Sequence, residues 1–239
     1  MATQAPPDHW SEDSLTEYLQ TYRSNQFGTF ANKGQSIKDL INIDALFGRL
    51  TGAINPRPSN PMLFLLRAHS AYRAGVGAVM GGQLFESQAV LRLCLEHAAY
   101  GFYIGSNSDR MEIWRRRGDS DANRKAVRKE FHNKKITAYI ESQAPTIYRQ
   151  FDHLYNKLID LGAHPNEEGY SRNSTVTNID GDKYINTIYL QGDGALLDSS
   201  IKIAAQVGLW SLSLMQSLYR ERYELLGIRE ELEELRKRF

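Results

Sequence analysis

The stretch from residue 62 to residue 104 constrains the fold most, because it is apolar over most of its length. Gly81-Gly82 is the expected break in this stretch, since two glycines inside a helix cost roughly 2 kcal/mol relative to two alanines. Asn60 is the expected cap at its start, with Pro61 at the first helical position. The stretch therefore predicts two consecutive helices that follow a proline-rich connector.

The rest of the chain also has mostly helical spacing of its apolar residues. A first helix is expected to start near Ser11 and to end before a loop that contains Gly28 and Gly34. Ser36 is the expected cap of the next helix, with Asp39 three positions later. Further helices are predicted at residues 108–117, 119–143, 145–161 and 196–226, and residues 161–169 are predicted to form a loop.

The pattern changes to strict alternation near residue 174. Asp180-Gly181 stands between β-forming residues there, which is a strong hairpin signal. A two-stranded hairpin is not stable by itself in water, so its apolar residues are expected to pack on the bundle or on another chain: Val176, Ile185, Ile188 and Tyr189. The predicted fold class is all-α, a multi-helix bundle with one inserted β-hairpin at about residues 174–191.

Three segments organise the predicted fold. Residues 1–59 form an N-terminal helical segment and the proline-rich connector, residues 60–227 form the bundle core with the hairpin, and residues 228–239 form a charged C-terminal helix. The last segment has a balance of acidic and basic side chains, which is typical of a solvated helix or of a coiled-coil arm for a partner. The sequence leaves both alternatives open.

Composition excludes several classes of function. The net charge of +1, from 29 basic and 28 acidic residues, excludes a strongly basic nucleic-acid coat but not a local patch. Cys94 is the single cysteine, so an internal disulfide and a cysteine-based zinc site are excluded. No apolar run reaches the roughly 20 residues that cross a bilayer, and no secretory signal is present, so we expect a cytoplasmic protein that does not enter a membrane. Neither a phosphate-binding loop nor metal-ligand spacing of histidines is found, and no metal or cofactor is predicted.

Ionisable side chains in the apolar segment are the first candidate site. Arg92 and Glu96 lie four apart on one helical face, while His97 lies about 140° further round than Arg92. His69 and Arg73 form a similar stripe on the preceding helix, and antiparallel packing would let the two stripes face each other. Two interpretations remain: a structural ion pair, or a pocket in which the arginines bind a phosphate or carboxylate.

The sequence His164-Pro165-Asn166 is the second candidate. A residue before proline is held in an extended conformation, which can aim the His164 ring at a fixed target. Histidine is the usual side chain for proton transfer near neutral pH. The alternative is a loop histidine whose ring bonds to a helix end.

A basic region at residues 110–135 is the third candidate, with ten positive and four negative side chains. Trp114 and Phe131 lie among the cations, and such a patch can hold a phosphate backbone with rings for stacking. The predicted nucleic-acid contacts are Trp114, Arg115, Arg116, Arg117, Arg124, Lys125 and Arg128. The alternative is a solvated helical face.

Two segments resemble a known superfamily. The sequence "VLRLCLEHAAYGFYI", followed later by "YNKLIDLGAHPN", is similar to uncharacterised bacterial helical proteins with an Arg-x-x-x-Glu helix and a His-Pro loop, and to the wider HEPN superfamily. The resemblance covers about residues 60–225. Active HEPN ribonucleases carry Arg-x(4–6)-His and cut RNA without metal at a dimer interface; Arg92 and His97 fit that spacing, although Leu93 stands where those enzymes commonly have a polar residue.

The resemblance implies a HEPN-like module of a bacterial antiviral defence or toxin-related system that binds RNA, a nucleotide or a partner protein as a homo-oligomer. A ribonuclease of this kind would use Arg92 to stabilise phosphate charge and His97 or His164 as acid and base, with Glu96 beside them. His69, Arg73 and Asn166 would bind a ligand. The alternatives are a non-enzymatic subunit that docks a partner through the hairpin and C-terminal helix, and a sensor of a small anionic ligand.

Overall fold

The computed structural model describes residues 5–52, 61–165 and 167–239 and is mostly helical. The predicted cap Asn60 and its connector lie outside these residues. Helices in the first part of the chain are α1 (Ser14–Asn32), α2 (Gly34–Thr51), α3 (Pro61–Met80), α4 (Leu84–Gly105), α5 (Ser108–Arg115), the 3₁₀ turn η1 (Arg116–Gly118), α6 (Asp121–Glu130) and α7 (Asn133–Gln143). The remaining elements are α8 (Pro145–Leu158), the π-helical turn η2 (Ile159–Ala163), α9 (Glu167–Arg172), β1 (Ser174–Ile179), β2 (Asp182–Thr187), α10 (Ala195–Gln216), α11 (Arg220–Leu225) and α12 (Ile228–Arg236).

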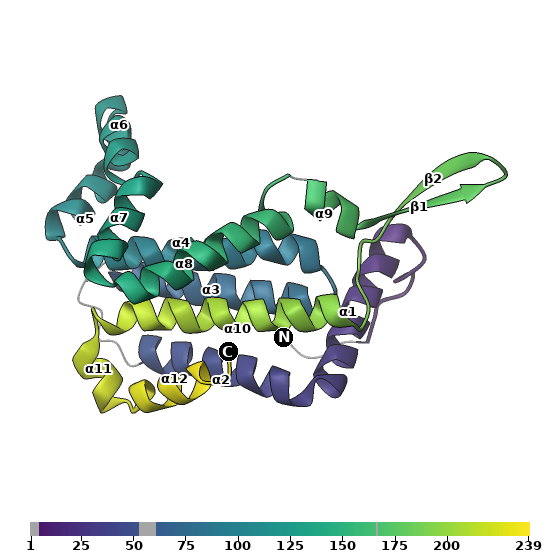
Figure 1. The fold of residues 1–239 in the computed structure, drawn as a ribbon, viewed down its shortest axis with the longest axis horizontal. Coiled ribbons are helices and arrows are strands. Elements are labelled where there is room, and N and C mark those ends of the chain that lie inside the picture. The colour runs from purple at the N-terminus through teal and green to yellow at the C-terminus, as the bar shows by residue number, and fades with distance from the viewer. Residues whose placement is uncertain (1–4, 53–60, 166) are drawn as a thin grey trace.

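Helices α3, α4 and α10 form the centre of the bundle, and α2 and α8 pack on α10 from two sides (Figure 1). The predicted break at Gly81-Gly82 is confirmed. Gly82 has a φ of +90° there, and a Cβ at this position would lie 2.5 Å from the carbonyl oxygen of Gln191. Only glycine fits this turn without strain, because the segment that enters α10 passes directly against it.

The C-terminal helix α12 shares the central core. Ile228, Leu232 and Leu235 are buried against α2 and α10, while the charged residues of α12 face solvent. Arg238 also pairs with the buried carboxylate of Asp39 at 2.5 Å. The segment at residues 228–239 is therefore a packed element with one solvated face.

Several predicted boundaries are wrong, because contacts far along the chain override local signals. Gly28 lies inside α1, whose side chains Gln26 and Thr29 donate hydrogen bonds to the last carbonyls of α3. The first helix begins at Ser14, after the cap Asp13, and α2 begins at Gly34, so Ser36 is not a cap. Part of the expected loop at residues 161–169 forms η2 and the start of α9.

Two predicted helices are each interrupted. The helix expected at 119–143 is divided at Phe131, which turns inward and stacks on Tyr100 at 5.6 Å, and His132 caps the next helix. The helix expected at 196–226 ends at Gln216, where the chain turns back and buries Tyr223, whose hydroxyl donates to the carbonyl of Leu212. Burial of one aromatic ring outweighs helix continuity at both places.

The predicted hairpin is confirmed. Strands β1 and β2 pair antiparallel, with Val176 opposite Ile185, and a two-residue turn of Asp180 and Gly181 at φ of +53° and +94° joins them. Val176, Ile185 and Tyr189 are 62%, 61% and 70% exposed. The expectation that they pack on the bundle is wrong, and the alternative of packing on another chain stays a prediction.

Candidate functional site

The side chain of Arg92, a residue of α4, reaches the end of η2. Its Nη1 donates to the carbonyl of Ala163 at 3.0 Å, and its Nε lies 3.4 Å from Oε1 of Glu96, too poorly oriented for a hydrogen bond. Tyr155 donates its hydroxyl proton to the same carboxylate oxygen at 3.1 Å. These contacts connect α4, α8 and η2, and they give Nη1 of the guanidinium and Oε1 of the carboxylate a protein partner each, while the buried Nε of Arg92 makes no hydrogen bond.

His69 and Arg73 on α3 share a partner that sequence reasoning missed. Asp44 of α2 lies 2.6 Å from Nε2 of His69 and accepts two hydrogen bonds from Arg73, at 2.7 and 2.9 Å. His69 is buried and stacks on Phe47 at 5.0 Å. The signal that could have identified Asp44 is a lone acid in the apolar helix sequence "INIDALF".

Burial and hydrogen bonding oppose each other in this cluster. Burial would raise the pKa of Asp44, but the hydrogen bonds from Arg73 and His69 lower the pKa below its ordinary value. Burial also lowers the pKa of His69, against the opposing effect of Asp44. The lowered pKa of each group agrees with a neutral His69 ring that donates its Nε2 proton to an ionised Asp44.

The two polar stripes do not face each other. Arg73 contacts α2, whereas Arg92 contacts α4 itself and the end of η2, so the predicted anion pocket between the helices of Arg73 and Arg92 is not formed. Antiparallel packing of α3 on α4 is instead apolar and close, because a Cβ on Gly75 would lie 2.7 Å from Leu91.

The two candidate histidines lie in different places. His97 is half-buried near Phe64, at 6.4 Å between ring centroids, and burial together with the charge of Arg67 lowers its pKa. His164 follows Ala163 and has the extended backbone that its proline predicts, with φ of −145° and ψ of 144°. The structure therefore brings Arg92 to the His164 segment and keeps His97 on another face of α4. Asn166 lies outside the described residues.

The basic lobe, which we define as residues 108–130, contains α5, η1 and α6 and projects from one end of the bundle (Figure 1). Glu112 pairs with Arg115 at 3.5 Å and with Arg116 at 2.6 Å, and Asp121 pairs with Arg124 at 3.1 Å. Three predicted phosphate contacts thus already have acidic neighbours.

The aromatic rings of the predicted patch pack on the protein. Trp114 lies edge-on to Phe64 at 5.1 Å and is partly buried. Phe131 is 5% exposed and contacts Tyr100 and Tyr103. The prediction that Phe131 is available for base stacking is wrong, because the ring is buried against two tyrosine rings of α4.

The outer face of α6 carries three of the cations of the basic lobe that make no ion pair within the described residues. Lys125 and Lys129 each lie two residues from the buried Val127, and therefore about 160° around the helix from it. Arg128 lies next to them, and all three side chains are exposed. Among the residues that the structure describes, no carboxylate lies within 4.0 Å of these three cations or of Arg117.

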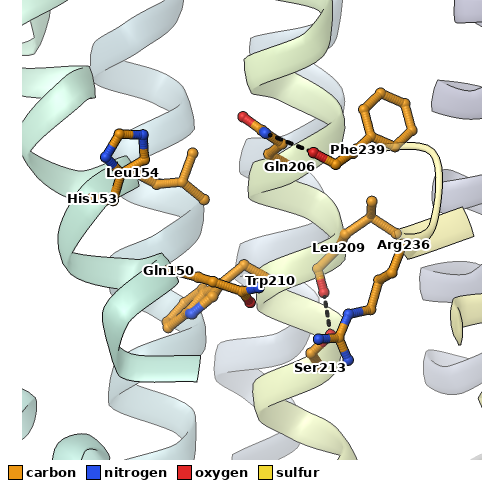
Figure 2. Close-up of a pocket in the computed structure, with 9 residues that line it drawn as sticks. All are labelled: Gln150, His153, Leu154, Gln206, Leu209, Trp210, Ser213, Arg236 and Phe239. Atoms are coloured by element: carbon orange, nitrogen blue, oxygen red, sulfur yellow. Dashed lines mark hydrogen bonds between the residues drawn. The ribbon is translucent and has the colours of Figure 1, made fainter. Parts of the chain in front are cut away.

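Two of the cavities among the described residues lie in the basic lobe and beside the C-terminal segment. A cavity of about 360 Å³ in the basic lobe is lined by Asp109, Glu112, Ile113, Arg116, Asn123 and Ala126. Figure 2 shows a second one of about 120 Å³, where α8 and α10 meet the C-terminal segment. It is lined by Leu154, Leu209 and Trp210, together with His153 of α8 and Arg236 of α12.

Metal-binding and membrane-spanning features are absent from the described ranges. No cluster of three or more His, Cys, Asp or Glu side chains there could hold a metal ion. None of the helices in these ranges combines the length and hydropathy needed to cross a bilayer. Comparisons of the chain with protein-family models, with curated proteins and with solved structures found no match.

Proposed function

We propose that this protein binds RNA through the phosphate groups, using the outer face of α6 in the basic lobe. The observation that carries the proposal is the group of exposed cations Lys125, Arg128 and Lys129, none of which has a carboxylate within 4.0 Å among the described residues. Exposed cations without an ion-pair partner bind a phosphate backbone favourably, because binding releases the counterions of the nucleic acid.

Binding without cleavage agrees best with the contacts of Arg92. Its guanidinium already binds the carbonyl of Ala163 and lies beside Glu96, while His97 faces Phe64. A HEPN-like defence or toxin-related system is the setting that we propose for this activity. That part of the proposal is supported by the resemblance in residues 90–104 and 155–166.

Fluorescence anisotropy with a labelled single-stranded RNA tests the proposal. Four phosphate contacts, from Arg117 and the three cations of α6, give a slope of about −2.8 in log K against log salt. Affinity should therefore fall about 50-fold between 50 and 200 mM salt. Simultaneous reversal of Lys125, Arg128 and Lys129 to glutamate should reduce the slope by about 2 and weaken binding at every salt concentration.

A variant of equal net charge provides the control. Arg23, Lys38 and Lys202 are exposed cations on α1, α2 and α10, and their reversal to glutamate should leave most of the RNA affinity intact. If both triple variants lose the same RNA affinity, net charge alone explains the loss, and the proposed binding surface on α6 is contradicted. RNA that is cut in the same samples, with cutting lost in an Arg92→Ala variant, would contradict binding without cleavage.

A further inference from the structure

The hairpin at residues 174–187 contacts α9 at its base, but among the described residues no helix covers either of its faces. Every residue of β1 after Ser174 and every residue of β2 is exposed, and the hairpin projects from the bundle at the end opposite the basic lobe (Figure 1). Val176 and Ile185 are paired on one face, while Tyr184 lies on the other face opposite Thr177. A two-stranded sheet with no covered face is at best marginally stable in water, so this element is incomplete by itself.

The register shows which backbone groups of β1 are free. The N–H of Ile188 donates to the carbonyl of Asn173 at 2.8 Å, so the odd-numbered residues of β1 direct their backbone groups toward β2. Antiparallel ladders alternate between such hydrogen-bonded pairs and non-hydrogen-bonded pairs. The N–H and C=O groups of Ser174, Val176 and Asn178 therefore point away from β2, along the free edge of the hairpin.

This edge lacks the features that usually prevent strand pairing. Edge strands are commonly protected by charged side chains, by proline or by a bulge. Strand β1 has the sequence Ser-Thr-Val-Thr-Asn-Ile, which contains no charge and no proline, and its pairing with β2 is continuous. Strand β2 has Asp182 and Lys183 at its start. The free edge of β1 can therefore accept a further strand more readily than that of β2.

We propose that the β1 edge pairs with the β1 edge of a second copy of this chain, antiparallel and centred on Val176. In this register Val176 opposes Val176 of the second copy, and Ser174 opposes Asn178, so all the outward backbone groups of β1 obtain partners. The same register places Ile185 and Val176 of both copies in one row across a four-stranded sheet. No like charges meet, because β1 has none. The inference does not depend on RNA binding.

Charged substitutions at Val176 test the register, since this side chain would lie directly opposite Val176 of the second copy. Sedimentation velocity at micromolar concentration should give a dimer of 27.2 kDa chains for the unmodified protein. Val176→Lys and Val176→Glu should each sediment as monomers, because like charges then stand directly opposite each other. An equimolar mixture of the two variants should recover the dimer.

Thr177→Lys is the matched control and should remain a dimer, because residue 177 lies on the other face and opposes Thr175 of the second copy. Circular dichroism should show an unchanged bundle in all variants, since Val176 is 62% exposed and far from the core. A monomeric unmodified protein would overturn the proposal, and the edge would then be assigned to an extended segment of a different protein. Dimers that persist in Val176→Lys, or monomers in the mixture, would overturn it equally.

Discussion

Replacement of Asp44 by alanine removes the shared partner of His69 and Arg73, and the contacts give the expected cost. His69 is 7% exposed and would lose a hydrogen bond to a charged acceptor at 2.6 Å, which contributes about 1.5–3 kcal/mol. The side chain of Arg73 is 62% exposed, so its ion pair contributes about 0–1 kcal/mol. We expect a loss of about 2–3 kcal/mol in the free energy of unfolding at pH 7.

Thermal and urea denaturation measure this loss. For a chain of this length, the midpoint of thermal unfolding should fall by roughly 4–12 °C in Asp44→Ala. Asp44→Asn should lose less, because its amide oxygen can still accept the bond from His69. Arg73→Ala should lose less than about 1 kcal/mol. If Arg73→Ala destabilises the protein as much as Asp44→Ala, the hydrogen bond from the buried His69 is not the main contribution of Asp44 to the free energy of unfolding.

The pH dependence of this cluster follows from the direction of its pKa shifts. The folded pKa of Asp44 is lowered, so the stability from its charge is present above the unfolded pKa of about 3.9 and is lost as the pH falls through the lowered value. The folded pKa of His69 is also lowered, so its contribution begins to decline as the pH falls below about 6.5. The difference in stability between the unmodified protein and Asp44→Asn should therefore be constant above about pH 6.5 and grow as the pH falls below that value, because His69 without the charge of Asp44 has a still lower pKa, and it should shrink again below about pH 4.

Three further predictions concern single side chains. Burial raises the pKa of the Cys94 thiol to about 12, so a thiol reagent at neutral pH should label it only after unfolding. Leu232→Ala should cost about 2–5 kcal/mol in urea denaturation, whereas the exposed neighbour Glu233→Ala should cost about 0.5 kcal/mol or less. Arg92→Ala should lose about 1–3 kcal/mol, because the Ala163 carbonyl loses its donor, with RNA affinity unchanged.

Opposite outcomes identify which argument fails. Fast labelling of folded Cys94 would contradict the burial of α4 at that position. Equal costs for the Leu232 and Glu233 variants would contradict the docking of α12 on the core. Loss of RNA binding at unchanged stability in Arg92→Ala would place Arg92 in the binding surface and would contradict its structural role.

Local signals were sufficient for much of the fold. The break at Gly81-Gly82 and the turn at Asp180-Gly181 were predicted because the conformational preferences of glycine depend only on the residues next to it: glycine disfavours a helix and favours a tight hairpin turn. The helix breaks near Phe131 and after Gln216 were not predicted, since they depend on rings that pack against distant helices. Nothing in the residues next to those breaks favours a turn strongly enough to indicate them.

The candidate site was predictable only in part, for the same reason. The Arg92–Glu96 pair follows from a spacing of four on a helix and is present at 3.4 Å. The hydrogen bond from Arg92 to Ala163 and the pairing of Asp44 with Arg73 join residues far apart in the chain. Sequence spacing within one helix carries no information about such partners, and the free charge on α6 becomes visible only when the ion pairs around it are known.

The basic lobe and the hairpin lie at opposite ends of the bundle (Figure 1). Two chains joined at their hairpins would present two basic lobes at the far ends of one long particle. A strand of RNA long enough to reach both would be held at two points, and its second contact would form at an effective concentration set by the length between them. Such a particle would discriminate RNA by length, with a steep gain in avidity once the strand spans both lobes.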